Sequence, residues 1–515
     1  MFFDLFVSLL PFLAFVAMVF VFRLSLLKSI FVALISVSVI VYFSTRFHLA
    51  LDGVSRSVLI GSAVSLNVVM VVLPGLVFNN ILKRQGVIDE VIRWFESWRV
   101  PVESRVLLMI VGVLPVVESL TGFGVCLLVG VPIFSSLFGA HAGSRLSMLG
   151  MNCMPWGVLA LPTLVGADLC GMDASLLSSM SAVTSSLIFP YFSLVALWVC
   201  GGWSSIKRFW VLALLMSACY SMVVMLVSLY GPFELAGVLA GLCVIVVFFC
   251  LKAWGQVSAN EEKTVMGAGS TQALTFLSSC RLFFPYLILL VLAVLIKVDF
   301  VSDWLSNQLV YDVHGVSLRV LGNPGLAIVA SCVLVFFLKP VELPVALLLK
   351  RSLAITFVLF GFVLLSQLMS ASGMMGVPVA FLIEVVGEKF WVFALLSPVL
   401  GMFSGFLAGS NLGGNALMMN VQCQIGALFE SEVLFAAIQN SSAGHAVYGS
   451  LAIIVLILAI MKEVSSDRHT TFDDSAMIND LMMFGFKVAI GVYLLIVLAA
   501  WAGNDWFGSW MTGVS

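Results

Sequence analysis

The chain has 515 residues, of which 62% are hydrophobic and 10% charged, and its mean hydropathy is +1.17. These values lie far outside those of soluble domains and indicate a multi-pass membrane protein. The net charge of −2, without a long basic run, gives no reason to expect nucleic-acid binding. The ten cysteines show no Cys-x-x-Cys spacing, so we expect buried apolar side chains rather than a metal cluster or a disulfide framework.

A membrane-spanning helix needs about 20 largely apolar residues. The first spans are predicted at about 5–22, 26–44 and 57–80, followed by an amphipathic interfacial helix within 83–105. Residues 1–22 lack a basic n-region, so we expect a first helix rather than a cleaved signal peptide. Further spans are predicted at about 145–165, 175–199, 209–230, 233–251, 282–298, 325–338, 353–371, 432–461 and 482–502. The expected fold is an all-α membrane protein with about 12 transmembrane helices.

Glu118 is the single carboxylate in the apolar segment 114–129. Burying a carboxylate at lipid depth is costly, so such an acid is a candidate functional residue. Gly122 and Gly124 follow it and allow the chain to leave the helix and turn back. We therefore expect a re-entrant hairpin that carries a polar site.

The distribution of positive charge supports this hairpin. We assign the loops at 23–28, 83–105, 140–145, 201–208, 252–281, 339–351 and 462–487 to the cytoplasmic side. They hold 19 of the 24 Lys and Arg residues, and the five others are Arg46, Arg56, Lys297, Arg319 and Lys389. The assignment requires residues 106–140 to enter and leave on the same side. The same alternation makes 390–430 a second hairpin, which enters from the outside.

The order of elements repeats along the chain. In each half a span is followed by an interfacial stretch, a glycine-broken hairpin and a span with polar residues. We expect an inverted repeat, with repeat one at 24–200, repeat two at 320–505 and connecting spans at 201–319, within one transmembrane domain of residues 1–515. This order predicts a binding site between the two hairpins.

The second hairpin is rich in neutral polar side chains, namely Ser410, Asn411, Asn415, Asn420, Gln422 and Gln424. Such groups donate hydrogen bonds to an anion and cost less to bury than an ammonium group. Free backbone N–H groups at the N-terminus of a broken helix add to this affinity. The expected ligand is a small carboxylate held between the hairpin tips.

Glu118 would lie beside that anion. Because two neighbouring anions repel, we expect the acid to be protonated when substrate is bound, which is a physical basis for proton symport. The alternative is a structural carboxyl that stays neutral or caps backbone groups of the hairpin. No cofactor is expected other than the coupling proton.

Polar residues also follow each hairpin: Asn152 after the first, and Asn440, Ser441 and Ser442 after the second. They could line the same cavity or mediate close helix packing, and their matching places favour the cavity. His445 could titrate near neutral pH, although a lone histidine more often has a packing role. Arg145 is expected to mark the cytoplasmic face.

These motifs resemble those of the L-lactate permease family of bacterial secondary transporters. The first family signature resembles Glu-Gly-x-x-Gly-Phe-Gly-x-Pro, matched here by Glu118, Gly122, Phe123 and Gly124. The second resembles Gly-Ser-Asp-Thr-Ser-Ser-Asn-Ala-Leu with a following Asn-x-Gln, matched by Gly409, Ser410, Asn415, Ala416, Leu417, Asn420 and Gln422. The third, Asn-Ser-Ser-Gly-Gly, is matched by Asn440, Ser441, Ser442 and Gly444.

The resemblance implies proton-coupled uptake of lactate, glycolate or a similar 2-hydroxy acid across a bacterial inner membrane. This chain departs from the pattern in the second hairpin, where Asn411 replaces Asp, Leu412 replaces Thr, and two glycines replace a Ser pair. In the first hairpin, Ser119 replaces Gly and Val125-Cys126 stand where Thr-Pro is usual. A changed lining could relax or redirect selectivity.

The sequence thus predicts a transporter of the bacterial inner membrane that moves a small monocarboxylate with protons and binds neither metal nor nucleic acid. Glu118 is the expected proton site, and the expected substrate-binding residues are Ser119, Thr121, Gly122, Gly124, Asn152, Ser410, Asn411, Asn415, Gln422, Asn440, Ser441, Ser442 and His445. An uncoupled facilitator or a transporter-derived sensor would keep the same fold. An intramembrane enzyme has little support, since no His-Glu-x-x-His, paired-aspartate or Gly-x-Ser-x-Gly motif occurs.

Overall fold

A computed structural model describes residues 2–96, 100–122, 124–253, 276–306, 308–314, 316–466 and 474–506. Within these ranges eleven helices are long and apolar enough to cross a membrane, or twelve if the bent pair Met154–Cys170 and Ala174–Ser185 forms one span. Large apolar side chains, such as Phe31 and Phe357, are exposed along the helix surfaces. A helix that is apolar on its outer face is suited to lipid, so the chain is a multi-pass membrane protein.

The helices of the first half are α1 (Phe2–Phe20), α2 (Leu26–Phe43), α3 (Leu51–Gln85), α4 (Val87–Glu96), α5 (Val102–Leu108), α6 (Leu114–Thr121), α7 (Val125–Leu149), α8 (Gly157–Cys170), α9 (Ala174–Ser185) and α10 (Ile188–Tyr230). The connecting region contains α11 (Ala236–Ala253), α12 (Phe276–Ile296), α13 (Asp299–Ser306), β1 (Val310–Val313) and β2 (Val316–Arg319). The second half contains α14 (Gly325–Leu338), α15 (Val345–Ala371), α16 (Gly376–Val386), α17 (Phe390–Ala408), α18 (Asn411–Leu428), α19 (Glu432–Gly444), α20 (Leu451–Ser466) and α21 (Asp474–Trp506).

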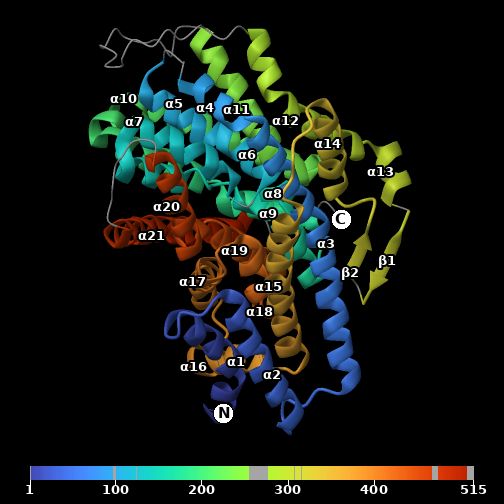
Figure 1. Ribbon diagram of the computed structural model, residues 1–515. Coiled ribbons are helices and arrows are strands. Elements are labelled where there is room, and N and C mark those ends of the chain that lie inside the picture. The colour runs from blue at the N-terminus through green and yellow to red at the C-terminus, as the bar shows by residue number, and fades with distance from the viewer. Residues whose placement is uncertain are drawn as a thin grey trace.

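Two long helices, α3 and α15, pack side by side along the molecule, and α2 packs on α15 (Figure 1). Small residues allow the close approach, because Gly61 of α3 faces the Phe360 ring and Gly361 of α15 faces Ile30. Figure 1 places α5–α7 in the upper half of the view and α16–α18 in the lower half, with α8, α9 and α19 between them. The two broken segments therefore approach the middle from opposite ends. Whether they are re-entrant within a bilayer, and related as an inverted repeat, stays a prediction.

Two predicted spans are wrong, because the structure divides each of them between two helices. The span at 145–165 is interrupted between α7 and α8, where residues 151–153 leave the helix and Met154–Trp156 form a 3₁₀ turn. The span at 175–199 is divided between α9 and α10. The span at 432–461 is confirmed as one candidate span, Glu432–Glu463, within which a 3₁₀ turn at Val447–Gly449 separates α19 from α20. Hydropathy did not reveal these breaks because the interrupting residues are themselves largely apolar.

The predicted interfacial helix at 83–105 corresponds to α4, whose apolar residues Ile88, Val91 and Phe95 are buried. An element that was not expected is the antiparallel pair β1–β2, which aligns Val310 with Arg319. It is a small exception in an otherwise helical chain.

The expectation that the cysteines are unpaired is wrong for Cys170 and Cys423, which form a disulfide with Cα atoms 6.1 Å apart. It joins the end of α8 to α18 across 253 residues of sequence. Spacing along the chain could not show this pairing, because a single distant pair has no local pattern.

Candidate functional site

The first broken segment turns sharply at its glycines. α6 ends at Thr121, Gly122 (φ 66°) and Gly124 (φ 74°) both have positive φ, and α7 begins directly afterwards. A Cβ on Gly122 would lie only 1.9 Å from the Cγ2 of Val158. Both the backbone conformation and the available space therefore require glycine at this position.

Glu118 lies in this tip and is fully buried. Its carboxylate accepts hydrogen bonds from the backbone N–H groups of Gly124 and Cys126, each over 3.3 Å. These groups belong to the start of α7, where the helix dipole favours negative charge. The first tip thus supplies its own carboxylate at the N-terminus of its second helix.

The second tip is built in the same way but without a carboxylate. Gly409 (φ 65°) ends α17, and the Oγ of Ser410 accepts a hydrogen bond from the N–H of Gly413 over 3.0 Å. The first turn of α18 contains no acidic residue. The positive end of this helix is consequently capped by a neutral hydroxyl alone.

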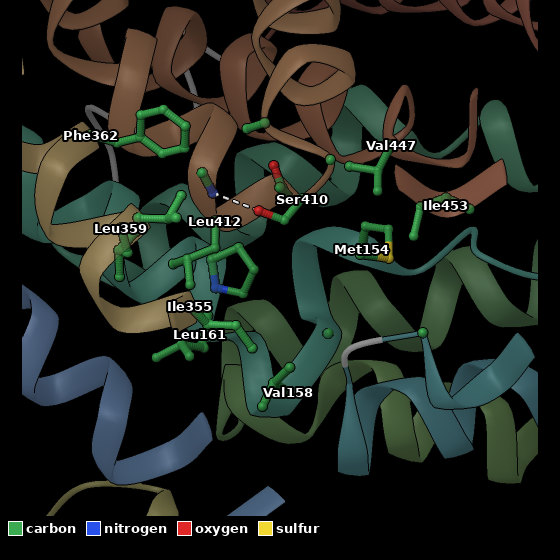
Figure 2. A pocket seen from close by; sticks show the side chains of 18 of the residues that line it. Met154, Val158, Leu161, Ile355, Leu359, Phe362, Ser410, Leu412, Val447 and Ile453 are labelled. Atoms are coloured by element: carbon green, nitrogen blue, oxygen red, sulfur yellow. Dashed lines mark hydrogen bonds between the residues drawn. The ribbon is translucent and has the colours of Figure 1, made fainter. Parts of the chain in front are cut away.

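A cavity of about 420 Å³ lies between the two tips (Figure 2). Glu118 and Gly124 line one side, and residues 409–413 line another. Of the 22 lining residues, only Glu118, Ser410 and Asn411 have polar side chains. The two breaks after the hairpins also reach the cavity, through Met151 and Met154 in one case and Val447 in the other. Four irregular segments therefore meet at one place.

The α8 end of the cavity has an unusual backbone. Val158, Leu159 and Ala160 have φ values of 51°, 54° and 55°, in the left-handed region. This conformation costs roughly 1–2 kcal/mol for each residue with a Cβ and persists only where the surroundings enforce it. Val158 packs on Gly122 and lines the cavity, so the strained turn lies where the first tip meets the cavity wall.

Buried amides join the second tip to the first half of the chain. Asn411 and Asn415 both donate to the Oδ1 of Asn440, over 3.0 and 2.9 Å. Asn440 donates to Thr163 of α8 and to Ser181 of α9, each over 2.9 Å. Asn411 lines the cavity, whereas Asn415 and Asn440 lie behind it as its support.

A second cluster of hydroxyl groups extends away from the cavity. Ser441 contacts Thr184 over 2.6 Å and Ser185 over 3.0 Å, and Ser185 lies 3.0 Å from the Nε2 of His445. The imidazole packs edge-on against Phe189 and Phe192. This arrangement gives His445 and Ser441 evident packing roles between α9, α10 and α19.

The remaining predicted site residues lie outside the cavity lining. Ser119 contacts Cys153, and the hydroxyls of Thr121 and Ser442 bond to carbonyl groups of their own helices, those of Val117 and Ile438. These bonds satisfy buried hydroxyls locally.

Two predicted amides likewise bond within the protein. Asn152 donates to the carbonyl of Ile110 over 2.9 Å, within a π-helical turn at Met109–Val113. Gln422 donates to the carbonyl of Ser397 over 2.9 Å. Arg145 forms an ion pair with Asp480 and does not line the cavity.

Sequence reasoning missed the partners that first-half helices contribute, Thr163 and Ser181. A signal was present, because Ser178, Ser181 and Ser185 recur at helical spacing on α9 and all are buried. The apolar wall from α15, formed by Ile355, Val358, Leu359 and Phe362, was also missed. No sequence signal separates such residues from those that face lipid.

Comparison with known proteins identifies the family of the chain. No curated protein matches it. Among solved structures, the YdaH transporter of Alcanivorax borkumensis, whose topology was described as unusual, is similar with a TM-score of 0.42 and 14% identity over 85% of each chain. A family model described as L-lactate permease matches residues 4–314, which include the first tip and stop before the second. Since this match spans more than half of the sequence, the chain belongs to the L-lactate permease family.

Proposed function

We propose that the protein is a secondary transporter of the bacterial inner membrane that moves a small monocarboxylate together with a proton. The observation that carries this proposal is the cavity between the two tips, with the N-terminus of α18 on one side and Glu118 on another. The first N–H groups of a helix lack intrahelical partners and attract anions. A substrate carboxylate would bind there, beside Ser410 and Asn411.

Charge supports the coupling to protons. Among the lining residues there is no Lys, Arg or His, so an incoming carboxylate meets no cation within the described cavity. An ionised Glu118 would repel it in a mostly apolar site. Transfer of one proton with each substrate removes the repulsion, and Glu118 is the residue that would carry it.

A second candidate function, an uncoupled facilitator, is favoured by the hydrogen bonds from Gly124 and Cys126 to Glu118. In that case the carboxylate is a permanent cap of α7 and does not exchange a proton during transport.

Uptake into proteoliposomes separates the two functions. Labelled lactate, glycolate and pyruvate are supplied with and without an inward proton gradient, and recovery of unchanged substrate shows transport rather than conversion. We expect the gradient to drive accumulation in the wild type, and to lose its effect in Glu118→Gln while substrate exchange continues. The matched control is Glu388→Gln, at an exposed glutamate outside the cavity. An unchanged response of Glu118→Gln to the gradient would exclude Glu118 as the coupling residue.

A further inference from the structure

The cavity is large for the acids that a lactate-type permease would carry. Its volume of about 420 Å³ is many times the roughly 10–15 Å³ that one water needs. Lactate has only three carbons and three oxygens, so it would leave part of this space to water or empty. An apolar cavity gains little from holding water, which has too few partners there.

Polar groups are confined to the region of the two tips. Ser410 is the one hydroxyl among the lining side chains, and its oxygen already accepts from the N–H of Gly413. Leu412, in the first turn of α18, presents an apolar side chain to the cavity (Figure 2). A hydroxyl on the substrate finds few partners besides the unpaired Oδ1 of Asn411, whereas a carboxylate finds the start of α18.

The wall formed by α15, which packs beside α18, is apolar. Ile355, Leu359 and Phe362 of α15 face the cavity together with Leu161 of α8 (Figure 2). The cavity lining is therefore amphipathic: it offers one site for an anion and an extended apolar surface for a hydrocarbon tail. Ligand sites commonly combine a mainly apolar lining with a few polar groups that fix the orientation.

We propose that the preferred substrate is a monocarboxylate with an apolar tail of about four to eight carbons, linear, branched or aromatic, rather than a short 2-hydroxy acid. This inference rests on the proposed function, because it assigns the tail of the same substrate whose carboxylate binds at α18. Ile355, Val358, Leu359 and Phe362 would bury the tail and determine selectivity.

Calorimetric titration of the full chain in lipid nanodiscs tests the proposal. Binding is measured rather than uptake because medium-chain acids cross bilayers unaided when protonated. The ligands are acetate, butyrate, hexanoate, phenylacetate and lactate. The gain is expected to be about fourfold in affinity for each buried methylene, or roughly 15-fold from butyrate to hexanoate. Hexanol is expected not to compete, because it lacks the carboxylate.

The effect of the hydroxyl is tested with 2-hydroxyhexanoate and hexanoate. We expect the hydroxyl to weaken binding or to leave it unchanged, since the apolar wall offers no partner for it. Tighter binding of lactate than of hexanoate, or equal competition by hexanol, would overturn the inference.

Val358→Trp narrows the cavity at the wall, and Val329→Trp is the matched control at an exposed position of α14. We expect the first variant to weaken hexanoate binding by about tenfold while acetate changes little. Equal losses for both acids would count against the assigned wall. If this variant does not fold, the affinities of the wild-type protein for the series of acids still test the proposed preference for an apolar tail.

The two proposals fail separately. Gradient-driven lactate uptake without any gain from longer tails would overturn this inference and leave the proposed function in place. Tight binding of hexanoate by a protein that transports no carboxylate would support the cavity chemistry and overturn the proposed function.

Discussion

The side chain of Asn415 donates a hydrogen bond to the Oδ1 of Asn440 over 2.9 Å, and the same oxygen also accepts from Asn411. Asn440 in turn donates hydrogen bonds to Thr163 and Ser181. This buried amide thus connects the second tip to two helices of the first half. Asn415 adds a direct bond to α8, donating to the carbonyl of Pro162 over 3.0 Å.

Replacing this amide should destabilise the protein. Asn440→Ala removes four hydrogen bonds. Asn415 still donates to Pro162 and Thr163 to Pro155, but Asn411 and Ser181 lose their partner, and each unsatisfied group costs about 1–3 kcal/mol. We expect a clearly lower midpoint of thermal unfolding in detergent, measured by intrinsic fluorescence. The control is Asn420→Ala, which removes one hydrogen bond to Ser366 at a half-buried position. Equal midpoints for the two variants would show that the network contributes no special stability.

The turn at Gly122 should not tolerate a side chain. Gly122→Ala places a methyl group against Val158 and forces alanine to a φ of 66°. Gly86→Ala isolates the cost of positive φ, since a Cβ there meets nothing within 4 Å.

We expect Gly122→Ala to reduce folded yield far more than Gly86→Ala, as judged by size-exclusion chromatography. The additional substitution Val158→Ala should restore part of the yield. No rescue by the second substitution would mean that the backbone, and not the contact with Val158, sets the requirement.

Glu118 should contribute to stability as well as to transport. Glu118→Ala removes the acceptor of two buried N–H groups, at a cost of about 1–3 kcal/mol each, whereas Glu118→Gln keeps one amide oxygen as an acceptor. We therefore expect the midpoint of thermal unfolding to be lowest for Glu118→Ala, higher for Glu118→Gln and highest for the wild type. If Ala and Gln were equally stable, the capping bonds would have no net effect on folding.

Chemical labelling of the two disulfide-bonded cysteines tests the predicted orientation of the chain in the membrane. The charge distribution predicts that residue 170 and the end of α18 near Cys423 lie on the outer side, where disulfides persist. In intact cells, we expect an impermeant maleimide to label these cysteines after treatment with an impermeant reductant.

The matched control for this labelling is Cys170→Ser, in which Cys423 should react without reduction. Labelling that requires permeabilised cells would reverse the assigned orientation.

The parts of the fold that depend only on runs of apolar residues and on glycine positions were predictable from the sequence. α1, α2 and α3 lie where apolar runs predicted them, and Gly122 and Gly409 end helices close to the expected turns. The divisions between α7 and α8 and between α19 and α20 were not predictable. Their residues are mostly apolar, and the left-handed turn at Val158 packs against Gly122, which is distant in sequence.

The candidate site was predictable in part for the same reason. Glu118, Ser410 and Asn411 reach the cavity because each lies at a break that glycine marks in the sequence. Asn440 and Gln422 are equally polar, but they form hydrogen bonds within the protein. Only these partners distinguish a residue that supports the cavity from one that lines it. Those partners lie in other helices, so spacing along one segment does not reveal them.

The link between Cys170 and Cys423 also closes the segment between these two residues into a covalent ring. A single backbone cut between these residues, for instance at a protease site inserted in the exposed segment 339–342, would open the ring without releasing either piece. The nicked protein should run as one species on a non-reducing gel and as two after reduction. Separate synthesis of the two pieces is then a practical route to labelling one hairpin at a time.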